Sequence, residues 1–299
     1  MTGGSDPAPA GARATAPGPI DRWSIGIYSG PSALELSPAD GVTNPVLTWR
    51  DITDIRAAFV ADPFMVEDAG RWFMFFEILN ADSRKGVIGL AMSDDARRWS
   101  YQGVVIEEPF HLSYPCTFRH GDDFYLVPET LSPRCVQIYR ATSFPFRWSR
   151  VSTLLETQAA DPSLFCHAGR WWMFFCQRPL NATLRLYHAD DLLGPWSEHP
   201  CSPVVAADER HARPAGRVVL DGDRLVRYAQ DCQTTYGRCV HAFEITELTP
   251  TGYCERPYSA NPILSPGSDG WNRNRMHHVD PHATAQGGWI ACVDGDSEG

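Results

Sequence analysis

Five segments of the sequence share one pattern: an X-Pro dipeptide, a short strand, a Gly-containing turn and then an aromatic or apolar strand. The X residues are Asp62, Tyr114, Asp161, Arg213 and Asp280. They recur at intervals of 52, 47, 52 and 67 residues, and the first and third copies are nearly identical in sequence. A repeat of this length built from strands is typical of propeller blades, which are four-stranded sheets packed around a channel. The pattern predicts an all-β, five-bladed β-propeller.

The segments between these copies complete the predicted blades. Residues 86–93, 135–141, 184–189 and 239–245 read as outer strands, and Trp99, Trp148 and Trp196 follow the first three of them. We expect these indoles to pack between blades. Residues 22–28 are expected to form an outer strand that closes the ring with the last blade. Residues 45–48 are expected to form a second short strand.

Composition limits the class of protein. The chain has 299 residues, of which 43% are hydrophobic, so a core can form, and a five-bladed propeller uses residues 21–299 as one domain. The net charge is −10 without a basic run, which argues against binding to nucleic acid or anionic membranes. No apolar stretch reaches the length of a membrane span.

The N-terminus and the cysteines suggest a compartment. Residues 1–20 are rich in Gly, Ala and Pro and have no continuous apolar core, which predicts a disordered leader and not a secretory signal. Nine Cys without a C-x-x-C pattern argue against a disulfide framework and against structural zinc. The sequence therefore predicts a cytoplasmic protein with reduced thiols.

Polar residues recur where the repeats should meet on the axis. Besides the X residues, the ends of the second strands carry Glu77, Glu129, Cys176 with Gln177, Gln230 with Asp231, and Asp294. A fold that needed only stability would repeat equivalent apolar residues there, whereas these residues are mostly polar and differ between blades. Such differentiation on a symmetric frame indicates a site. The alternative is that each Asp-Pro only turns the chain, with Asp accepting backbone N–H bonds.

The most polar segment is His-His-Val-Asp-Pro-His at residues 277–282. If it is extended, alternation places His278, Asp280 and His282 on one face and His277 on the other. Pro281 argues for a strand end or bulge, and the competing interpretation is a solvated loop. Imidazole and carboxylate are normal metal ligands. We nevertheless expect no metal, because the Pro interrupts the strand that would keep the three ligands together.

The sequence resembles two groups of known proteins. Residues 61–64 and 70–77 resemble the first blade of five-bladed glycoside hydrolases of the family 43 and family 32 type. Over about residues 22–296 the chain is more similar to the N-terminal domain of glucosamine inositolphosphorylceramide transferases and its bacterial stand-alone relatives. The matching stretches are residues 60–64, 111–115, 127–129, 212–217, 230–232, 236–237 and 276–282. The glycosyltransferase domain of the plant proteins is a separate C-terminal domain, which this sequence does not contain.

The resemblance to the hydrolases implies roles for three carboxyl groups. Asp62 matches the Asp that acts as base or nucleophile in these hydrolases, and Asp161 matches their second Asp, which tunes a pKa in the site. The chain departs from the hydrolase pattern at the acid, because Gln230, beside Asp231, stands where a Glu is expected, and Glu129 comes from an earlier blade. We expect Asp62 to be ionised and Glu129 to be the acid, since an apolar run before Glu129 would raise its pKa. The alternative is an ionised Glu129 paired with Arg213.

The predicted function is that of a carbohydrate-active enzyme. It would cleave or transfer a glycosyl group by acid–base chemistry, acting without a cofactor on a glycoside, sugar phosphate or nucleotide sugar. A phosphorylated substrate is included because Arg and His groups would line the pocket. The alternatives are a glycan-binding propeller without activity and a lyase, cyclase or isomerase of specialised metabolism. The predicted catalytic residues are Asp62, Glu129 and Asp161. The predicted substrate-binding residues are Glu77, Tyr114, Arg213, Arg217, Gln230, Asp231, His278, Asp280 and His282.

Overall fold

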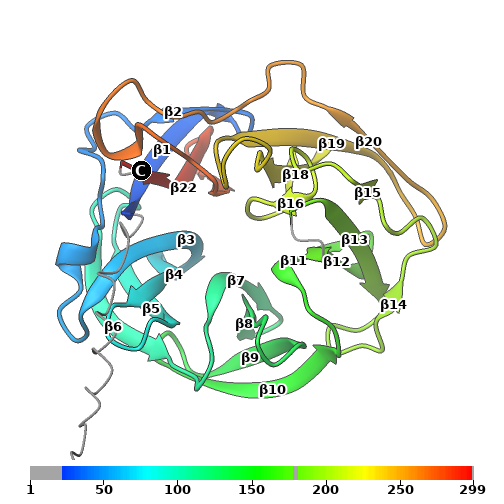
Figure 1. Cartoon of the computed structure of the whole chain (residues 1–299), viewed down its shortest axis with the longest axis horizontal. Coiled ribbons are helices and arrows are strands. Elements are labelled where there is room, and N and C mark those ends of the chain that lie inside the picture. The colour runs from blue at the N-terminus through cyan, green and yellow to red at the C-terminus, as the bar shows by residue number, and fades with distance from the viewer. Residues whose placement is uncertain (1–21, 178–180, 298–299) are drawn as a thin grey trace, which may run out of the picture.

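The propeller predicted from the repeat is present in the structure. A computed structural model describes residues 22–177 and 181–297, whose regular secondary structure is β-strand except for two short 3₁₀ helices. Five antiparallel sheets in this part of the chain surround a central axis (Figure 1). The five-bladed fold is therefore confirmed, while the predicted leader, residues 1–20, lies outside the described residues. No helix among the described residues has the length and hydropathy needed to cross a bilayer.

In the first four blades the chain runs from the axis outwards. The first blade consists of β3 (Ala57–Asp68), β4 (Arg71–Asn80), β5 (Gly86–Ser93) and β6 (Ser100–Ile106). The second consists of β7 (Ser113–His120), β8 (Asp123–Glu129), β9 (Val136–Ser143) and β10 (Arg147–Leu155). The third consists of β11 (Ala160–His167), β12 (Arg170–Gln177), β13 (Thr183–Ala189), β14 (Ser197–Glu198) and β15 (Val205–Ala206). The fourth consists of β16 (Arg213–Pro214), β17 (Val219–Asp221), β18 (Arg224–Gln230), β19 (Val240–Leu248) and β20 (Tyr253–Pro257).

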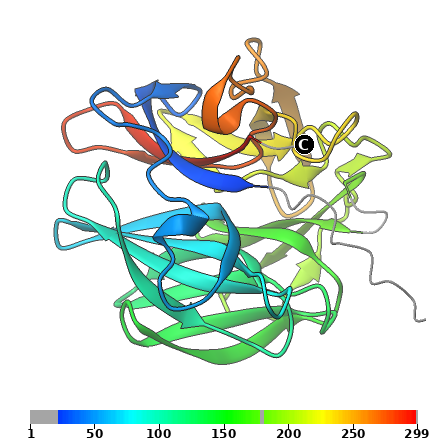
Figure 2. The same ribbon diagram turned by 60° about the vertical axis from the view of Figure 1, so that its left-hand side comes forward.

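The fifth blade joins the two ends of the described chain. Its inner strands are β21 (Val279–Ala283) and β22 (Trp289–Asp296), and its outer strands are β1 (Trp23–Ser32) and β2 (Glu35–Pro38). In Figure 2 the blue N-terminal strand accordingly lies beside the red C-terminal strand, and β1 pairs with β22 along its length. The predicted closing strand is confirmed. Backbone pairing of many consecutive residues holds the ring shut at this blade.

The short strand expected at residues 45–48 is not a strand in the structure. Only Leu47 forms an isolated bridge, with Ile25, and Pro45 can donate no backbone hydrogen bond. The chain then enters the 3₁₀ helix η1 (Trp49–Asp51), where Thr48 and Asp51 cap each other's backbone. Because the helix begins directly after Thr48, the extended segment at residues 45–48 ends before it can form a longer ladder with β1.

The apolar core lies between neighbouring blades. One cluster, for example, packs Phe75 and Leu90 of the first blade against Phe124 and Leu126 of the second. Trp99, Trp148 and Trp196 are partly buried at such interfaces, as predicted. Their indole N–H groups donate to the carbonyl oxygens of Ala96, Pro145 and Leu192, respectively.

The innermost strands differ in a way that decides where the X residues point. In β3, β7 and β11 the pairing register shifts at the X-Pro dipeptide, and Asp62, Tyr114 and Asp161 have φ of +52°, +47° and +52°. These are β-bulges, which bend a strand and redirect a side chain. Arg213 and Asp280 stand instead in regular pairs, with Gln230 and Cys292.

Candidate active site

Polar side chains from all five blades meet on the propeller axis. Asp62 and Asp161 lie at the bulges of β3 and β11, Glu129 is the last residue of β8, and Arg213 is the first residue of β16. The strands β3, β11 and β16 face the centre of the ring in Figure 1. Each of the four residues is at most 9% exposed. We call this set, completed by four more residues, the axial cluster: Asp62, Glu77, Glu129, Asp161, Arg213, Gln230, His277 and Asp294.

Arg213 and Asp161 form the rigid side of the axial cluster. Arg213 Nε donates to Asp161 Oδ2 at 2.6 Å, and Nη2 donates to Oδ1 at 3.4 Å. Gln230 Nε2 also donates to Asp161 Oδ2, at 2.9 Å. Glu129 Oε2 accepts the backbone N–H of Asp161 at 3.0 Å and lies 3.6 Å from Arg213 Nη2. Asp161, not Glu129, is therefore the main partner of the guanidinium group.

His277 bridges two carboxyl groups on the other side of the cluster. Its Nδ1 lies 2.7 Å from Asp294 Oδ1, and its Nε2 lies 3.7 Å from Asp62 Oδ1. Asp294 also accepts the backbone N–H of Asp62 at 3.0 Å. The His277 ring stacks on Trp23 with 3.9 Å between ring centres, so its orientation is fixed. Asp294 thus fixes the backbone of Asp62, and His277 places a ring nitrogen near its carboxyl group.

Burial shifts the acid–base properties of this cluster. It raises the pKa of Asp62 to about 7, because the opposing charge of His277 does not compensate for burial beside Asp161 and Asp294. It raises the pKa of Glu129 to about 8, with Asp161 adding to burial and Arg213 opposing it. We expected the cationic groups to keep Asp62 ionised, but desolvation is the larger effect. The pKa of both carboxyl groups is raised, so the assignment of Glu129 as the proton donor stays a prediction.

Three polar atoms in the axial region make no hydrogen bond among the described residues. They are Glu77 Oε1 and both ring nitrogens of His278. His111 Nε2 is 3.3 Å from Glu77 Oε1, but outside hydrogen-bonding geometry. Burial raises the pKa of Glu77 well above its usual range and lowers the pKa of His278 to about 4, so the His278 ring is neutral at pH 7. Buried polar atoms without a partner are uncommon in folded proteins, so these three atoms are exceptions among the described residues.

Arg217, Asp280 and His282 form a second cluster. Arg217 Nε donates to Asp280 Oδ1 at 2.7 Å, and His282 Nε2 lies 2.9 Å from Asp280 Oδ2. Arg217 Nη2 also donates to the carbonyl oxygens of Met65 and Thr117. The pKa of Asp280 is held well below its usual range, because Arg217 and His282 outweigh burial. The structure places Asp280 in this second cluster, where it binds Arg217 of the neighbouring blade, and not beside Asp62 as predicted.

Two further predicted binding residues lie outside the axial cluster. Tyr114 is fully buried, with its hydroxyl 2.7 Å from Ser163 Oγ and accepting the Gly216 N–H at 2.6 Å. It fills the centre of the ring as a packing residue. Asp231 points away from Gln230 and toward the side chains of Cys239 and His241.

Some axial residues were not singled out from the sequence. His277 was placed on the opposite face from the polar group, yet it precedes β21, so strand alternation does not govern it. Asp294 was noted only as a polar strand end. Tyr236 lies over Arg213, with 4.9 Å from the guanidinium carbon to the ring centre, and its ring edge faces His277. The available signal for Tyr236 was the Tyr-Gly pair among the stretches shared with the transferase family.

The described residues contain two groups with potential metal-ligand geometry. One is Asp62, His277 and Asp294, and the other is Asp231, Cys239 and His241. In the first group the Nδ1–Oδ1 contact of 2.7 Å is a hydrogen bond, and it is too short for two ligands of one ion. The considered set of His278, Asp280 and His282 is not brought together, since His278 faces Asp62 at 3.8 Å.

The sequence model of the family described as glucosamine inositolphosphorylceramide transferase 1, N-terminal, matches residues 18–296. The protein of that name from Oryza sativa subsp. japonica is 36% identical over 92% of the chain, and the one from Arabidopsis thaliana is 30% identical over 92%. The matches cover 40% and 39% of these two relatives, so the chain spans about two fifths of their length.

Solved structures share the fold at low sequence identity. The catalytic domain of a Coprinopsis cinerea family 62 α-L-arabinofuranosidase aligns with 93% of the chain and 97% of its own, at a TM-score of 0.60 and 15% identity. A thermostable family 43 glycoside hydrolase aligns with 86% of the chain and 92% of its own, at a TM-score of 0.59 and 15% identity. This similarity supports the five-bladed architecture.

Proposed function

The chain belongs to the family of the N-terminal domain of glucosamine inositolphosphorylceramide transferase 1, and from this we propose that it is a carbohydrate-active enzyme. In this proposal the axial cluster cleaves or transfers a glycosyl group by acid–base chemistry. The names of the relatives support a sugar substrate, and the fold is one that glycoside hydrolases use. Because a fold alone does not define an activity, the residues of the axial cluster carry the proposal.

The observation that carries the proposal is the pair of buried carboxyl groups, Asp62 and Glu129, on different blades of one cluster, both with a raised pKa. At pH 7, Glu129 with a pKa of about 8 is mostly protonated, while about half of Asp62 is ionised. Glu129 Oε2 accepts from Asp161 N–H and faces Arg213, which leaves the proton on Oε1. One carboxylic acid and one carboxylate in the same site is the arrangement that glycosyl chemistry requires.

The remaining groups of the cluster would position this pair. Glu129 would donate its proton to the leaving-group oxygen as the glycosidic C–O bond breaks, and ionised Asp62 would stabilise positive charge at the sugar carbon or activate the acceptor. Asp294 holds His277 so that Nε2 faces Asp62, which favours the ionised form of Asp62. Arg213 keeps Asp161 in place beneath Glu129. His277 and Arg213 are thus positioning residues.

The charges of the site favour a particular class of sugar. Arg213 is bound to Asp161 and Arg217 to Asp280, so neither guanidinium is left to bind a phosphate. An incoming phosphate would also meet the carboxyl groups of the axial cluster at short range, with little screening by water. The site therefore fits an uncharged or amine-bearing glycosyl group better than a sugar phosphate or nucleotide sugar.

The test is a turnover and binding screen with glycosides, amino-sugar glycosides, sugar phosphates and nucleotide sugars. The variants are Asp62→Asn and Glu129→Gln, and the matched control is Glu107→Gln, which alters an exposed carboxyl group. Asn is chosen at residue 62 because it tolerates the φ of +52° better than Ala. We expect each axial variant to lose about 100-fold or more in kcat while retaining substrate binding.

The pH profile separates the acid role from a structural one. Wild-type activity should fall at high pH as Glu129 loses its proton, and Glu129→Gln should lose this alkaline limb. Near-wild-type turnover by Glu129→Gln would exclude it as the proton donor. A glycan that binds the axial site and is never turned over would contradict the enzymatic proposal and identify a glycan-binding propeller.

A further inference from the structure

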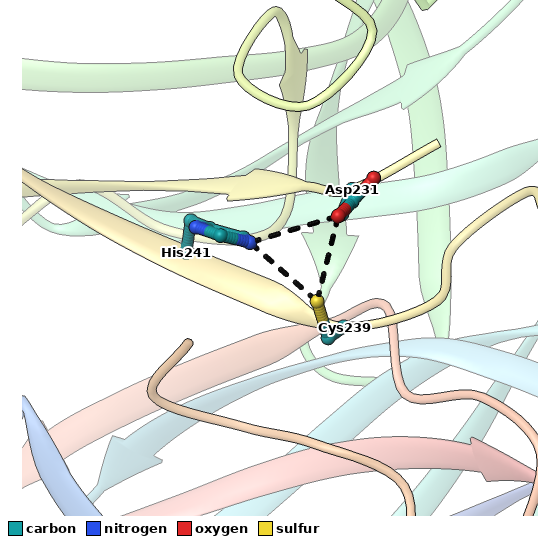
Figure 3. Close-up of side chains that lie close together, drawn as sticks. All are labelled: Asp231, Cys239 and His241. Atoms are coloured by element: carbon teal, nitrogen blue, oxygen red, sulfur yellow. Dashed lines mark hydrogen bonds and ion pairs between the residues drawn. The ribbon is translucent and has the colours of Figure 1, made fainter. Parts of the chain in front are cut away.

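A second polar cluster lies at the base of the loop between β18 and β19. Asp231 follows the end of β18, Cys239 precedes β19, and His241 lies within β19, and Figure 3 shows their side chains converging. Cys239 Sγ is 3.5 Å from His241 Nε2, Asp231 Oδ2 is 3.8 Å from the same nitrogen, and Sγ is 3.9 Å from Oδ2. Asp231 and Cys239 are buried, while the His241 side chain is 16% exposed.

The spacing of the three atoms is close to the edge lengths of a metal tetrahedron. Zinc bonds of about 2.0 Å to carboxylate oxygen, 2.0–2.1 Å to imidazole nitrogen and 2.3 Å to sulfur place neighbouring ligand atoms about 3.3–3.6 Å apart at tetrahedral angles. The observed Sγ–Nε2 separation of 3.5 Å falls in this range, and the two separations that involve Asp231 Oδ2, 3.8 Å and 3.9 Å, are longer than the ideal edges by about 0.4–0.5 Å. Small side-chain movements would therefore complete the coordination.

The geometry argues against a catalytic Cys-His-Asp relay. In a relay, the carboxylate binds one imidazole nitrogen and the thiol binds the other. Here both Asp231 and Cys239 approach the same nitrogen, His241 Nε2. Three ligand atoms that face one point, and not a line of three groups, are characteristic of an ion site.

We propose that Asp231, Cys239 and His241 bind one zinc ion through Oδ2, Sγ and Nε2. A thiolate and an imidazole are poor ligands for the hard cations Mg²⁺ and Ca²⁺, which prefer oxygen. Zn²⁺ accepts sulfur, nitrogen and oxygen ligands together. On binding, the thiol proton of Cys239 leaves to solvent, and the fourth position is taken by water on the exposed side of His241. No C-x-x-C pattern announces this site, because its ligands come from the two ends of a loop and a strand.

The proposed ion would fix the loop that covers the axial cluster. Asp231 N–H donates to Cys239 O at 2.9 Å, and Arg238 N–H donates to Asp231 O at 2.8 Å. These two backbone hydrogen bonds join the two ends of the loop. Its tip carries Tyr236, which lies over Arg213. A zinc ion at the base would hold that tip in place. This inference does not depend on the proposed catalytic function, because metal binding is measured directly.

Metal analysis of the whole chain tests the proposal. The protein is stripped with a chelator, titrated with zinc or cobalt(II), and examined by elemental analysis and by the sulfur-to-cobalt charge-transfer absorption. We expect one zinc per chain, a charge-transfer band with cobalt, and a higher Tm with zinc. Cys239→Ser should abolish the band and weaken zinc binding by more than about 100-fold.

Two variants serve as controls. Cys166→Ser changes an exposed thiol on β11, and Asp62→Asn removes one member of the axial group. Both should keep the band and the stoichiometry. A band that survives Cys239→Ser, or is lost in either control, would overturn the assignment. Should Cys239→Ser fail to fold, the wild type still decides, because a wild-type chain that takes up neither zinc nor cobalt refutes the site.

Discussion

The protonation of Glu129 in the folded protein can be tested without a substrate. Glu129 is 5% exposed, and burial with Asp161 raises its pKa from 4.5 to about 8. A carboxyl group whose folded pKa is raised stabilises the fold fully at pH values below its unfolded pKa. This contribution is lost as the pH rises through the folded value, because the unfolded chain releases its proton first. The window for Glu129 therefore runs from about pH 4.5 to pH 8.

The magnitude follows from proton linkage. One proton retained by the folded state and released by the unfolded state lowers the free energy of unfolding by about 1.4 kcal/mol per pH unit. Glu129→Gln removes this proton while preserving the acceptor for Asp161 N–H. From pH 5.5 to pH 7.5, we expect the wild type to lose roughly 2–3 kcal/mol more stability than the variant. Asp62, Glu77, His277 and His278 are present in both proteins, so the difference reports on Glu129.

The assay is equilibrium denaturation in urea at pH 5.5, 6.5 and 7.5 for the wild type, Glu129→Gln and the exposed-site control Glu107→Gln. The control should follow the wild-type dependence on pH. Parallel profiles for the wild type and Glu129→Gln would refute the reasoning. They would mean that Glu129 is ionised in the folded state and is paired with Arg213, which lies 3.6 Å away.

Two further perturbations test the axial framework. Arg213→Met should lower the free energy of unfolding, measured in urea, by about 3–5 kcal/mol, because it leaves Asp161 buried without its cation. Adding Asp161→Asn should recover much of this loss, and additive losses would contradict the pairing of the two residues. Gly237→Ala should lower Tm more than Gly121→Ala. A Cβ at Gly237 would lie 2.6 Å from His277 Cβ, whereas a Cβ at Gly121, which has a similar positive φ, would meet open space. Equal losses of Tm would contradict packing of the loop on His277.

Local pattern in the sequence determined the architecture. The repeated X-Pro segments, the alternating strands and the Trp anchors each reflect interactions within one blade or with the next blade, so they recur along the chain and can be read there. The closing strand at residues 22–28 followed from the same reasoning. Because the second strands end on the axis in every copy, the pattern also indicated the polar positions Glu77, Glu129 and Gln230.

Tertiary structure decided which side chains share the site. Asp62, Asp161 and Asp280 all precede Pro, but only the first two lie in bulges with positive φ, whereas Asp280 stays in register with Cys292. In a pleated strand, a shift of one residue reverses the direction of a side chain, so equivalent dipeptides point to different places. His277 reaches Asp62 only because the last blade packs against the first. Contacts between blades far apart in sequence, and not any local pattern, therefore set the composition and charge of the axial cluster.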